Sequence, residues 1–572
     1  MSAIMALFIL LISACSTPGK PTSSLTPMQT AKVEIRPSEV STDSPENNPV
    51  YLLLVAEMAL HQGQTDLAVQ NYLSLAKSQN NSEIAERAVR VAIYARQFDA
   101  AIVTAKRWIE LAPEDDEARQ ILASIYIRRN DSTEAFIYLD EIISSKSGEM
   151  QKKTLVKLMG ILAREKNTKT VLEVAKKIAD KYQHNAYAAY LYGMLAAQAN
   201  KPKLALMFLD NALAIQDIPG AHSNRAKMLI KLGRREEALV SLHQAVLNNP
   251  NHQKLRLTYA RLLVDLKQFD AARKEFEELN QIAPDDADLL YSLALLTMES
   301  KQLDSAEKYL RRLLELKKHL SESRYYLGRI NESRKNHQQA ISWYEQVESG
   351  EYQFDARLRA ARLLAESGQL QQARDKLKNM ADASQSKASL VRIYLTHGEI
   401  LRIAKEYHAA MDVYDLSLKI VPGNTDLLYA RALTGENIGR VDILERDILV
   451  ILKTEPDNAY ALNAIGFTLA DRTDRIDEAY AYLKRAITIT PDDPAIIDSF
   501  GWVNYRMGNF TEAVRLLRKA LSGQEDAEIA AHLGEVLWVS GETGEAKQVW
   551  RKALQKTPDD HFLQQVMQRY IP

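Results

Sequence analysis

Apolar residues recur along most of this chain with the spacing of an amphipathic helix, and the pattern itself repeats at a fixed interval. Each copy of the pattern contains a small anchor residue. The residue four positions after the anchor is always apolar, and the residue seven positions after it is apolar in all but one copy. Offsets of four and seven residues lie on one face of an α-helix. The pattern therefore predicts a helix around every anchor.

The anchor occurs fifteen times between residues 68 and 546, at a mean spacing of about 34 residues. Most anchors are alanine and two are larger; they are Ala68, Ala101, Ala135, Val171, Ala205, Ala238, Ala272, Ala306, Ala340, Ala373, Ala410, Leu444, Ala479, Ala513 and Ala546. Gly or Ala stands twelve residues before most anchors, which predicts a second helix packed closely against the first. Gly precedes six anchors by five residues, and Pro follows seven by twelve. Each copy therefore predicts a helix, a turn, a second helix and another turn.

The segments 226–238 and 500–513 are similar to tetratricopeptide repeats, whose period is about 34 residues. The resemblance extends over residues 50–558. It implies an all-α fold, an α-solenoid (right-handed superhelix) of about fifteen tetratricopeptide helix-turn-helix repeats. Residues 559–572 are also helical in pattern, and we expect them to form a C-terminal capping helix that covers the last repeat.

The N-terminus has the features of an export signal. An apolar run from Ala3 to Ala14 is too short to span a bilayer but suits the core of a secretory signal. Small residues Ser13 and Ala14 before Cys15 resemble a bacterial lipoprotein signal, which implies a signal peptide at 1–14 and a lipid on Cys15. Ser16, where an Asp would indicate retention at the inner membrane, implies that the protein is anchored in the outer membrane, on its periplasmic face.

The segment that follows the signal differs from the repeats. Residues 15–49 are rich in Pro, Ser, Thr, Lys and Glu and poor in large apolar residues. Such a composition does not bury enough apolar surface to offset the entropy of ordering the chain. We therefore expect a disordered tether between the lipid and the repeats.

Composition and motifs argue against several function classes. Lys and Arg number 73 against 74 Asp and Glu, so there is no general attraction to nucleic acid. The sequence has no phosphate-binding loop, nucleophile elbow or His-Glu-x-x-His motif, and its histidines are scattered. Acidic pairs such as Asp492-Asp493 follow prolines where helices begin, where carboxylates complement the helix dipole. We therefore predict a non-enzyme with no catalytic residue, cofactor, metal or small-molecule substrate.

The tetratricopeptide resemblance also implies where a partner would bind. The first helices of such repeats line a concave groove, with side chains 15, 11 and 8 residues before each anchor facing it. With one inserted residue allowed in the repeat of Ala479, these positions predict a protein-binding groove of Tyr190, Tyr291, Tyr325, Tyr429, Asn463, Phe467, Asp498, Trp502, Tyr505, Glu535 and Trp538. Aromatic residues with polar neighbours commonly anchor protein interfaces. The alternative is that these rings fill the space between repeats, and the sequence leaves both interpretations open.

Three functions are compatible with this organisation. Repeat lipoproteins of this kind resemble adaptors for periplasmic carboxyl-terminal processing proteases, which act on cell-wall hydrolases. That resemblance implies a membrane-tethered scaffold that recruits or activates such a protease and its substrates. The alternatives are a factor for assembly or export of an envelope component, such as a polysaccharide, a pilus or an outer-membrane complex, and a regulatory arm for an enzyme on another chain.

Overall fold

The computed structural model describes residues 48–571, and these residues fold into 31 helices with no strand among them. The predicted signal peptide, Cys15 and nearly all of the predicted tether lie outside the described residues. None of the helices in the described part is long and apolar enough to cross a membrane. The chain divides into two compact units, residues 1–309 and 310–572, and each is described by itself below.

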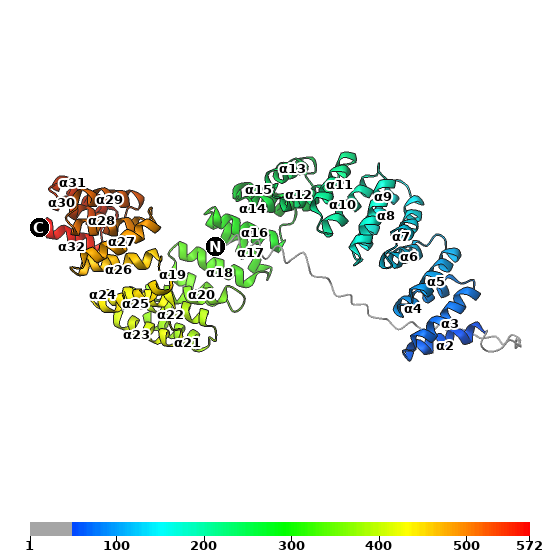
Figure 1. Cartoon of the computed structure of the whole chain (residues 1–572), viewed down its shortest axis with the longest axis horizontal. Helices are drawn as coiled ribbons and strands as arrows, with labels where there is room; N and C mark the ends of the chain where they lie inside the picture. The colour runs from blue at the N-terminus through cyan, green and yellow to red at the C-terminus, as the bar shows by residue number, and fades with distance from the viewer. Residues whose placement is uncertain (1–47, 572) are drawn as a thin grey trace. The chain divides into compact units, whose positions relative to one another are not determined.

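In the first unit, helices alternate between first and second members of hairpins (Figure 1). The first helices are α2 (Pro49–His61), α4 (Ser82–Tyr94), α6 (Asp116–Arg128), α8 (Gly148–Leu162), α10 (Ala186–Gln198), α12 (Pro219–Lys231), α14 (Gln253–Asp265) and α16 (Ala287–Glu299). The second helices are α3 (Thr65–Ser78), α5 (Phe98–Leu111), α7 (Ser132–Ser144), α9 (Thr168–Lys181), α11 (Pro202–Ile215), α13 (Arg235–Asn248) and α15 (Phe269–Ile282). Helix α17 (Leu303–Glu315) contains the boundary between the two units.

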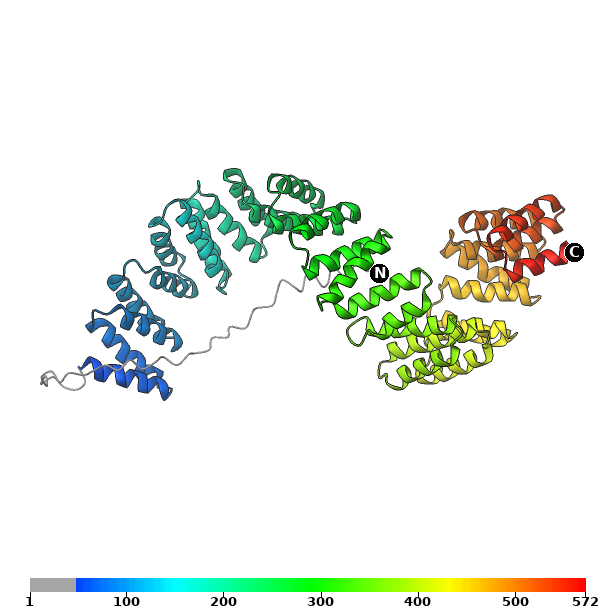
Figure 2. The same cartoon turned by 180° about the vertical axis from the view of Figure 1, so that it is seen from behind.

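The second unit continues the same alternation, which can be followed from both sides in Figures 1 and 2. Its first helices are α18 (Leu320–Ser333), α20 (Gln353–Glu366), α22 (Lys387–Ile403), α24 (Thr425–Asn437), α26 (Ala459–Arg472), α28 (Pro494–Arg506) and α30 (Ala527–Val539). Its second helices are α19 (His337–Glu345), α21 (Leu370–Asp382), α23 (Tyr407–Ile420), α25 (Val441–Thr454), α27 (Ile476–Ile489), α29 (Phe510–Gly523) and α31 (Thr543–Lys556). The last helix is α32 (His561–Tyr570).

The fifteen anchors occupy equivalent places in the fold. Every anchor lies in a second helix, the alanines and Leu444 are fully buried, and Val171 is 3% exposed. The helix that precedes each anchor in sequence is the first helix of the same hairpin. The prediction of an all-α solenoid built from helical hairpins is therefore confirmed.

Small residues on the first helices let the two helices of a hairpin approach closely. A Cβ atom at Gly534 would overlap the indole of Trp550, and one at Gly466 would lie 2.6 Å from Cγ of Leu483. Two hairpins have a larger residue at this position, Val89 on α4 and Met159 on α8. Helices α4 and α5 nevertheless pack closely, whereas the Cα traces of α8 and α9 approach each other less closely than those of α10 and α11.

Glycines at the turn within a hairpin adopt the left-handed conformation, as their spacing predicts. Gly63, Gly233 and Gly508 have φ values of 74°, 80° and 82°. At Gly63 the turn is closed by two backbone bonds: the Gly63 N–H donates to Leu60 O over 3.1 Å, and the next N–H donates to Ala59 O over 2.8 Å. Where glycine is absent, Asn130 takes the same conformation with φ of 63°, which Asn tolerates better than most residues.

Carboxylates cap several first helices. The second member of each acidic pair after a proline, Asp286, Asp493 and Asp560, accepts hydrogen bonds from backbone N–H groups in the first turn of the following helix. These groups would otherwise be unsatisfied, and the negative charge complements the helix dipole. The structural interpretation of these pairs is confirmed.

Helix α32 packs against α30 and α31 at the end of the last hairpin. Its Leu563 is fully buried and its Val566 is 1% exposed. The helix thereby covers apolar surface that a further repeat would otherwise cover.

The tight contact at Gly534 leads to a stability prediction. Replacing Gly534 with Ala forces the Trp550 indole to move, and we expect unfolding to become easier by roughly 1–3 kcal/mol. Gly544→Ala is the matched control, because nothing lies within 4 Å of its added Cβ and alanine favours the helix by roughly 0.5–1 kcal/mol. Urea unfolding followed by tryptophan fluorescence measures both, since three of the five tryptophans lie between residues 502 and 550. Equal midpoints for the two variants would contradict the proposed packing.

Candidate protein-binding site

Four consecutive first helices of the second unit, α24, α26, α28 and α30, enclose a cleft of about 260 Å³, which we name the α24–α30 cleft. These helices pack against one another in chain order and run from yellow to red in Figure 1. Apolar and aromatic side chains, carboxylates and neutral polar groups line it: Tyr429, Leu433, Ala464, Phe467, Ala495 and Ile529; Glu436, Asp498, Asp526 and Glu528; and Asn463, Thr468, Ser499 and Gln524. No Lys or Arg is among the residues that line the cleft.

Helical spacing brings these side chains to one surface. Tyr429, Leu433 and Glu436 stand at intervals of four and three residues on α24, so they share one face of that helix. Asn463 and Phe467 are related in the same way on α26. Because the first helices stack side by side, the equivalent faces of successive repeats join into one surface.

A buried histidine–carboxylate pair supports the floor of this region. Nδ1 of His532 lies 2.9 Å from one carboxylate oxygen of Asp498 and 3.1 Å from the other. The two side chains come from α30 and α28, and the residues are 2% and 6% exposed. Burial lowers the pKa of His532, but the charge and hydrogen bond of Asp498, with Glu528 and Asp471, outweigh it and raise the pKa above its ordinary value. The protonated imidazolium is thus favoured more than in a free histidine, and in this form His532 makes an ion pair with Asp498.

Aromatic rings surround His532. Its ring centroid lies 4.4 Å from that of Trp502 and 5.9 Å from that of Phe467. Trp502 also contacts Tyr505 at 5.0 Å, and the Tyr505 hydroxyl donates to Glu535 over 3.5 Å. These contacts join the residues of neighbouring repeats into one cluster beside the cleft.

The structure brings together seven of the eleven predicted groove residues. Tyr429, Asn463, Phe467 and Asp498 line the α24–α30 cleft. Trp502, Tyr505 and Glu535 belong to the adjacent aromatic cluster. Trp502 is 7% exposed and Glu535 is 9% exposed, so in this structure their main contacts are with neighbouring repeats rather than with solvent.

The remaining predicted residues lie elsewhere. Trp538 stacks on Trp550 and lies tilted against Tyr570 at the C-terminal end, with centroids 5.9 Å apart in both pairs. In the first unit, the Tyr190 hydroxyl accepts a hydrogen bond from Asn224 over 3.2 Å, and Tyr291 is 4% exposed. These contacts are those of packing residues, and the prediction that these side chains bind a partner stays a prediction.

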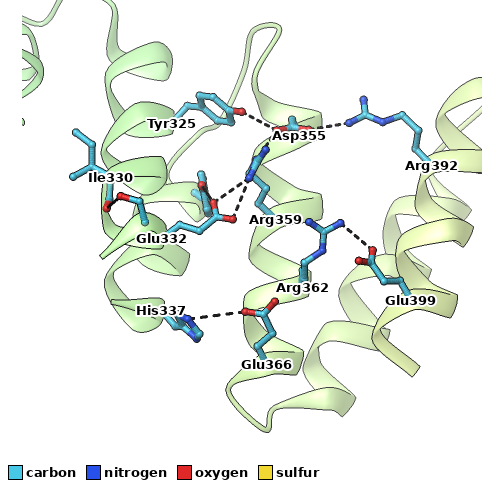
Figure 3. A network of polar contacts seen from close by, with 12 residues as sticks. Tyr325, Ile330, Glu332, His337, Asp355, Arg359, Arg362, Glu366, Arg392 and Glu399 are labelled. Carbon is cyan, nitrogen blue, oxygen red and sulfur yellow. Dashed lines mark hydrogen bonds and ion pairs between the residues drawn. The ribbon is translucent and has the colours of Figure 1, made fainter. Parts of the chain in front are cut away.

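Tyr325 takes part in a polar network between α18, α20 and α22 (Figure 3). The Tyr325 hydroxyl donates to Asp355 over 2.8 Å, and Asp355 also accepts from Arg359 and Arg392, each over 2.8 Å. Arg359 in turn donates to both oxygens of Glu332 over 3.1 Å. Charge is balanced here, because Asp355 and Glu332 each have an arginine partner.

The sequence did not single out Glu436, Asp526, Glu528 or His532. Glu436 stands eight residues before the anchor Leu444, so the same offsets that gave the aromatic residues could have identified it. Asp526 and Glu528 lie before and at the start of α30, outside those offsets. His532 meets Asp498 only through the stacking of one repeat on the next.

The chemistry of the cleft suits binding. Its polar lining consists of carboxylates, amides and hydroxyls, and the imidazole of His532 nearby is held by Asp498. Oδ1 of Asn463 is buried and has no hydrogen-bond partner. Among the described residues, no group of three or more His, Cys, Asp or Glu side chains is arranged to hold a metal ion.

The His532–Asp498 pair leads to a pH prediction. Because the folded state raises the pKa of His532 above its ordinary 6.5, the pair stabilises the fold fully below about pH 6.5. This stabilisation is lost as the pH rises through the folded pKa. We therefore expect the difference in unfolding free energy between wild type and His532→Gln to be larger at pH 6 than at pH 8.5. The exposed His561→Gln is the control and should show no such change; an equal difference at both pH values would contradict the ion pair.

Comparisons with known proteins agree with the geometry. Models of the tetratricopeptide repeat match residues 87–149, 229–296, 291–356, 459–493 and 500–561. Two solved structures also match in part, a thermophilic TPR protein, TTC0263, of Thermus thermophilus and the APC/C hetero-tetramer Cut9–Hcn1. The first is 23% identical and covers 30% of this chain and 93% of its own, with a TM-score of 0.28. The second is 12% identical and covers 92% of this chain and 97% of its own, with a TM-score of 0.34.

A full-length relative shows the family directly. The TPR repeat-containing protein PA4667 of Pseudomonas aeruginosa is 33% identical over 536 residues, which are 93% of this chain and 90% of that protein. The repeat period, the buried anchors and this match over nearly the whole chain lead to the same conclusion. The chain belongs to the tetratricopeptide repeat-containing proteins, a family of protein-interaction scaffolds.

Proposed function

We propose that this protein is a lipid-anchored adaptor on the periplasmic face of the bacterial outer membrane, which recruits or activates a carboxyl-terminal processing protease that acts on cell-wall hydrolases. The α24–α30 cleft is the observation that carries the binding part of this proposal. It is a concave site on the first helices, with aromatic walls and hydrogen-bonding groups, of the kind that holds a segment of another protein.

The membrane part of the proposal depends on the N-terminal sequence. Ser13, Ala14 and Cys15 match the end of a lipoprotein signal, and residues 15–49 provide a tether long enough to separate the repeats from the bilayer. Two or more acyl chains anchor a protein stably, whereas a single chain binds only marginally. An adaptor fixed in this way concentrates its partners at the membrane without catalysing a reaction itself.

The adaptor role rests on the organisation of the chain. The repeats leave the first helices free to bind one partner in one part of the solenoid and a second partner in another part. A scaffold that holds a protease and its substrate together raises the effective concentration of one near the other. This supports an adaptor for proteolysis, and assembly or export of an envelope component is the competing outcome of the test below.

The anchoring proposal is tested by changing residues 15 and 16. We expect Cys15→Ser to abolish incorporation of labelled palmitate and to release the protein from the membrane fraction. Ser16→Asp should keep the lipid but move the protein to the inner-membrane fraction on a sucrose gradient. If Cys15→Ser remained labelled and membrane-bound, the proposed anchor would be wrong.

The adaptor proposal is tested with the purified full chain and a carboxyl-terminal processing protease from the same bacterium. We expect the chain to bind the protease at micromolar concentration or tighter, and to accelerate cleavage of a peptidoglycan hydrolase. Phe467→Ala removes an aromatic wall of the cleft and should weaken binding of one of the two proteins about tenfold, which is about 1.4 kcal/mol.

Phe269→Ala is the matched control for this experiment. Phe269 is partly buried, like Phe467, and begins the second helix α15, outside the cleft lining. Circular dichroism melting curves show whether either variant has lost its fold. Absence of both binding and stimulation would refute the adaptor role, and co-purification with subunits of an export or secretion complex would favour the alternative.

A further inference from the structure

Two carboxylates of the α24–α30 cleft, Glu436 and Glu528, form no ion pair with any of the described residues. Glu436 accepts one hydrogen bond, from the Thr468 hydroxyl over 3.1 Å, and forms no ion pair in the described part of the chain. The side chain of Glu528 likewise forms no ion pair there. By contrast, the carboxylates of the α18–α22 network, Glu332 and Asp355, are each paired with arginine.

The other two carboxylates are already engaged. Asp498 is paired with His532, and Asp526 caps α30 by accepting from the Glu528 N–H over 2.8 Å. Asp526 caps α30 and Glu528 lies in the first turn of the same helix, so the helix dipole partly compensates both charges. Glu436 lies near the C-terminal end of α24 and has no such compensation.

These charges influence one another across the cleft. Burial raises the pKa of Glu436, and Arg472 and Arg402 only partly offset this effect. Although Glu528 is exposed at the surface, desolvation by its neighbours raises its pKa. The charge of His532 lowers this pKa, and repulsion from Asp498, Asp526 and Glu436 raises it further. A positively charged group between these carboxylates would remove the repulsion.

A second observation also indicates a donor. Asn463 is partly buried in the same wall, and its Oδ1 atom is shielded from solvent without a hydrogen-bond partner among the described residues. A shielded acceptor without a donor is rare in folded proteins. An ammonium group has three N–H donors and a guanidinium group has five. Either would satisfy both the amide oxygen and a carboxylate.

The size and walls of the cleft define the cation further. The described carboxylates are not clustered closely enough to hold a metal ion, and the cleft volume of about 260 Å³ suits a long side chain rather than a whole ligand. Tyr429 and Phe467 provide aromatic surface, against which the apolar stem of a lysine or arginine packs and a cation is attracted by the ring.

We propose that the α24–α30 cleft binds a lysine or arginine side chain of an extended segment of a partner protein, with Glu436 and Glu528 as the ionic partners, Asn463 as an acceptor, and Phe467 and Tyr429 as the walls. This inference rests on the proposed function as a protein-binding scaffold. It adds the chemical class of the bound segment, which the family alone does not give.

The test is a selection of random heptapeptides displayed on phage, with the immobilised full chain as target and the Phe467→Ala full chain as a depletion step. The step removes peptides that bind elsewhere. We expect the recovered peptides to carry Lys or Arg at one position several times more often than the unselected library. Recovered peptides without such a preference would overturn the inference while leaving a binding cleft intact. Recovery of no peptide that depends on Phe467 would overturn both the inference and the cleft as an interaction site.

One recovered peptide is then measured by fluorescence anisotropy. We expect Glu436→Gln/Glu528→Gln to weaken its binding at least about tenfold, and replacement of its lysine or arginine by norleucine to have a similar effect. Glutamine keeps the size of each side chain and can still accept from Thr468, so the fold should persist. Asp457→Asn/Asp474→Asn removes the same charge from exposed positions outside the cleft and should leave the affinity unchanged. Equal weakening by both double variants would show a general charge effect and refute the site.

Discussion

The close approach of two helices at a small residue is the contact on which the rest of this structure depends. In the last hairpin, Gly534 leaves room for the indole of Trp550, which also donates a hydrogen bond to Ala531 O over 3.3 Å. Fully buried alanine anchors on the second helices provide the matching surface from the other side. Because each hairpin is tight, its first helix is fixed in position, and successive first helices stack into one surface. The cleft exists only because four such helices are held in order.

Polar pairs between repeats help to fix the alignment of each repeat against the next, in addition to the apolar packing. Many of them join residues about one repeat apart: His532 and Asp498 are separated by 34 positions, and Arg475 and Glu445 by 30. Exposed pairs of this kind contribute little stability each, roughly 0–1 kcal/mol. Their spacing nevertheless penalises a shift of one repeat against the next, since a shift would separate every pair at once. The buried His532–Asp498 pair is the strongest constraint of this type near the cleft, because loss of either member leaves a buried polar group unpaired.

The sequence predicted the architecture well, because each repeat is defined by features that act between residues close together in the chain. Anchor spacing, turn glycines and capping carboxylates each have one dominant physical cause, and all of them recur in phase. Such local features do not determine how deeply a side chain is buried. Trp502 occupies a predicted groove position on α28, yet it is 7% exposed because His532 and Tyr505 from the same region cover its ring.

The chemistry of the cleft was harder to predict from the sequence, because it depends on which carboxylates have no arginine or lysine partner. Glu436 and Glu332 are both carboxylates on first helices, and the sequence around them does not distinguish their environments. Glu332 accepts two hydrogen bonds from Arg359. Among the described residues, Glu436 accepts a hydrogen bond only from the Thr468 hydroxyl. The difference arises from which residues of neighbouring repeats reach them. Some residues of each first helix face away from the second helix of the same hairpin and do not take part in hairpin packing. These residues can differ from repeat to repeat without destabilising the fold. A solenoid of this kind can therefore hold a charge-balanced face at α18–α22 and an acidic one at α24–α30, and so recognise chemically different segments with one architecture.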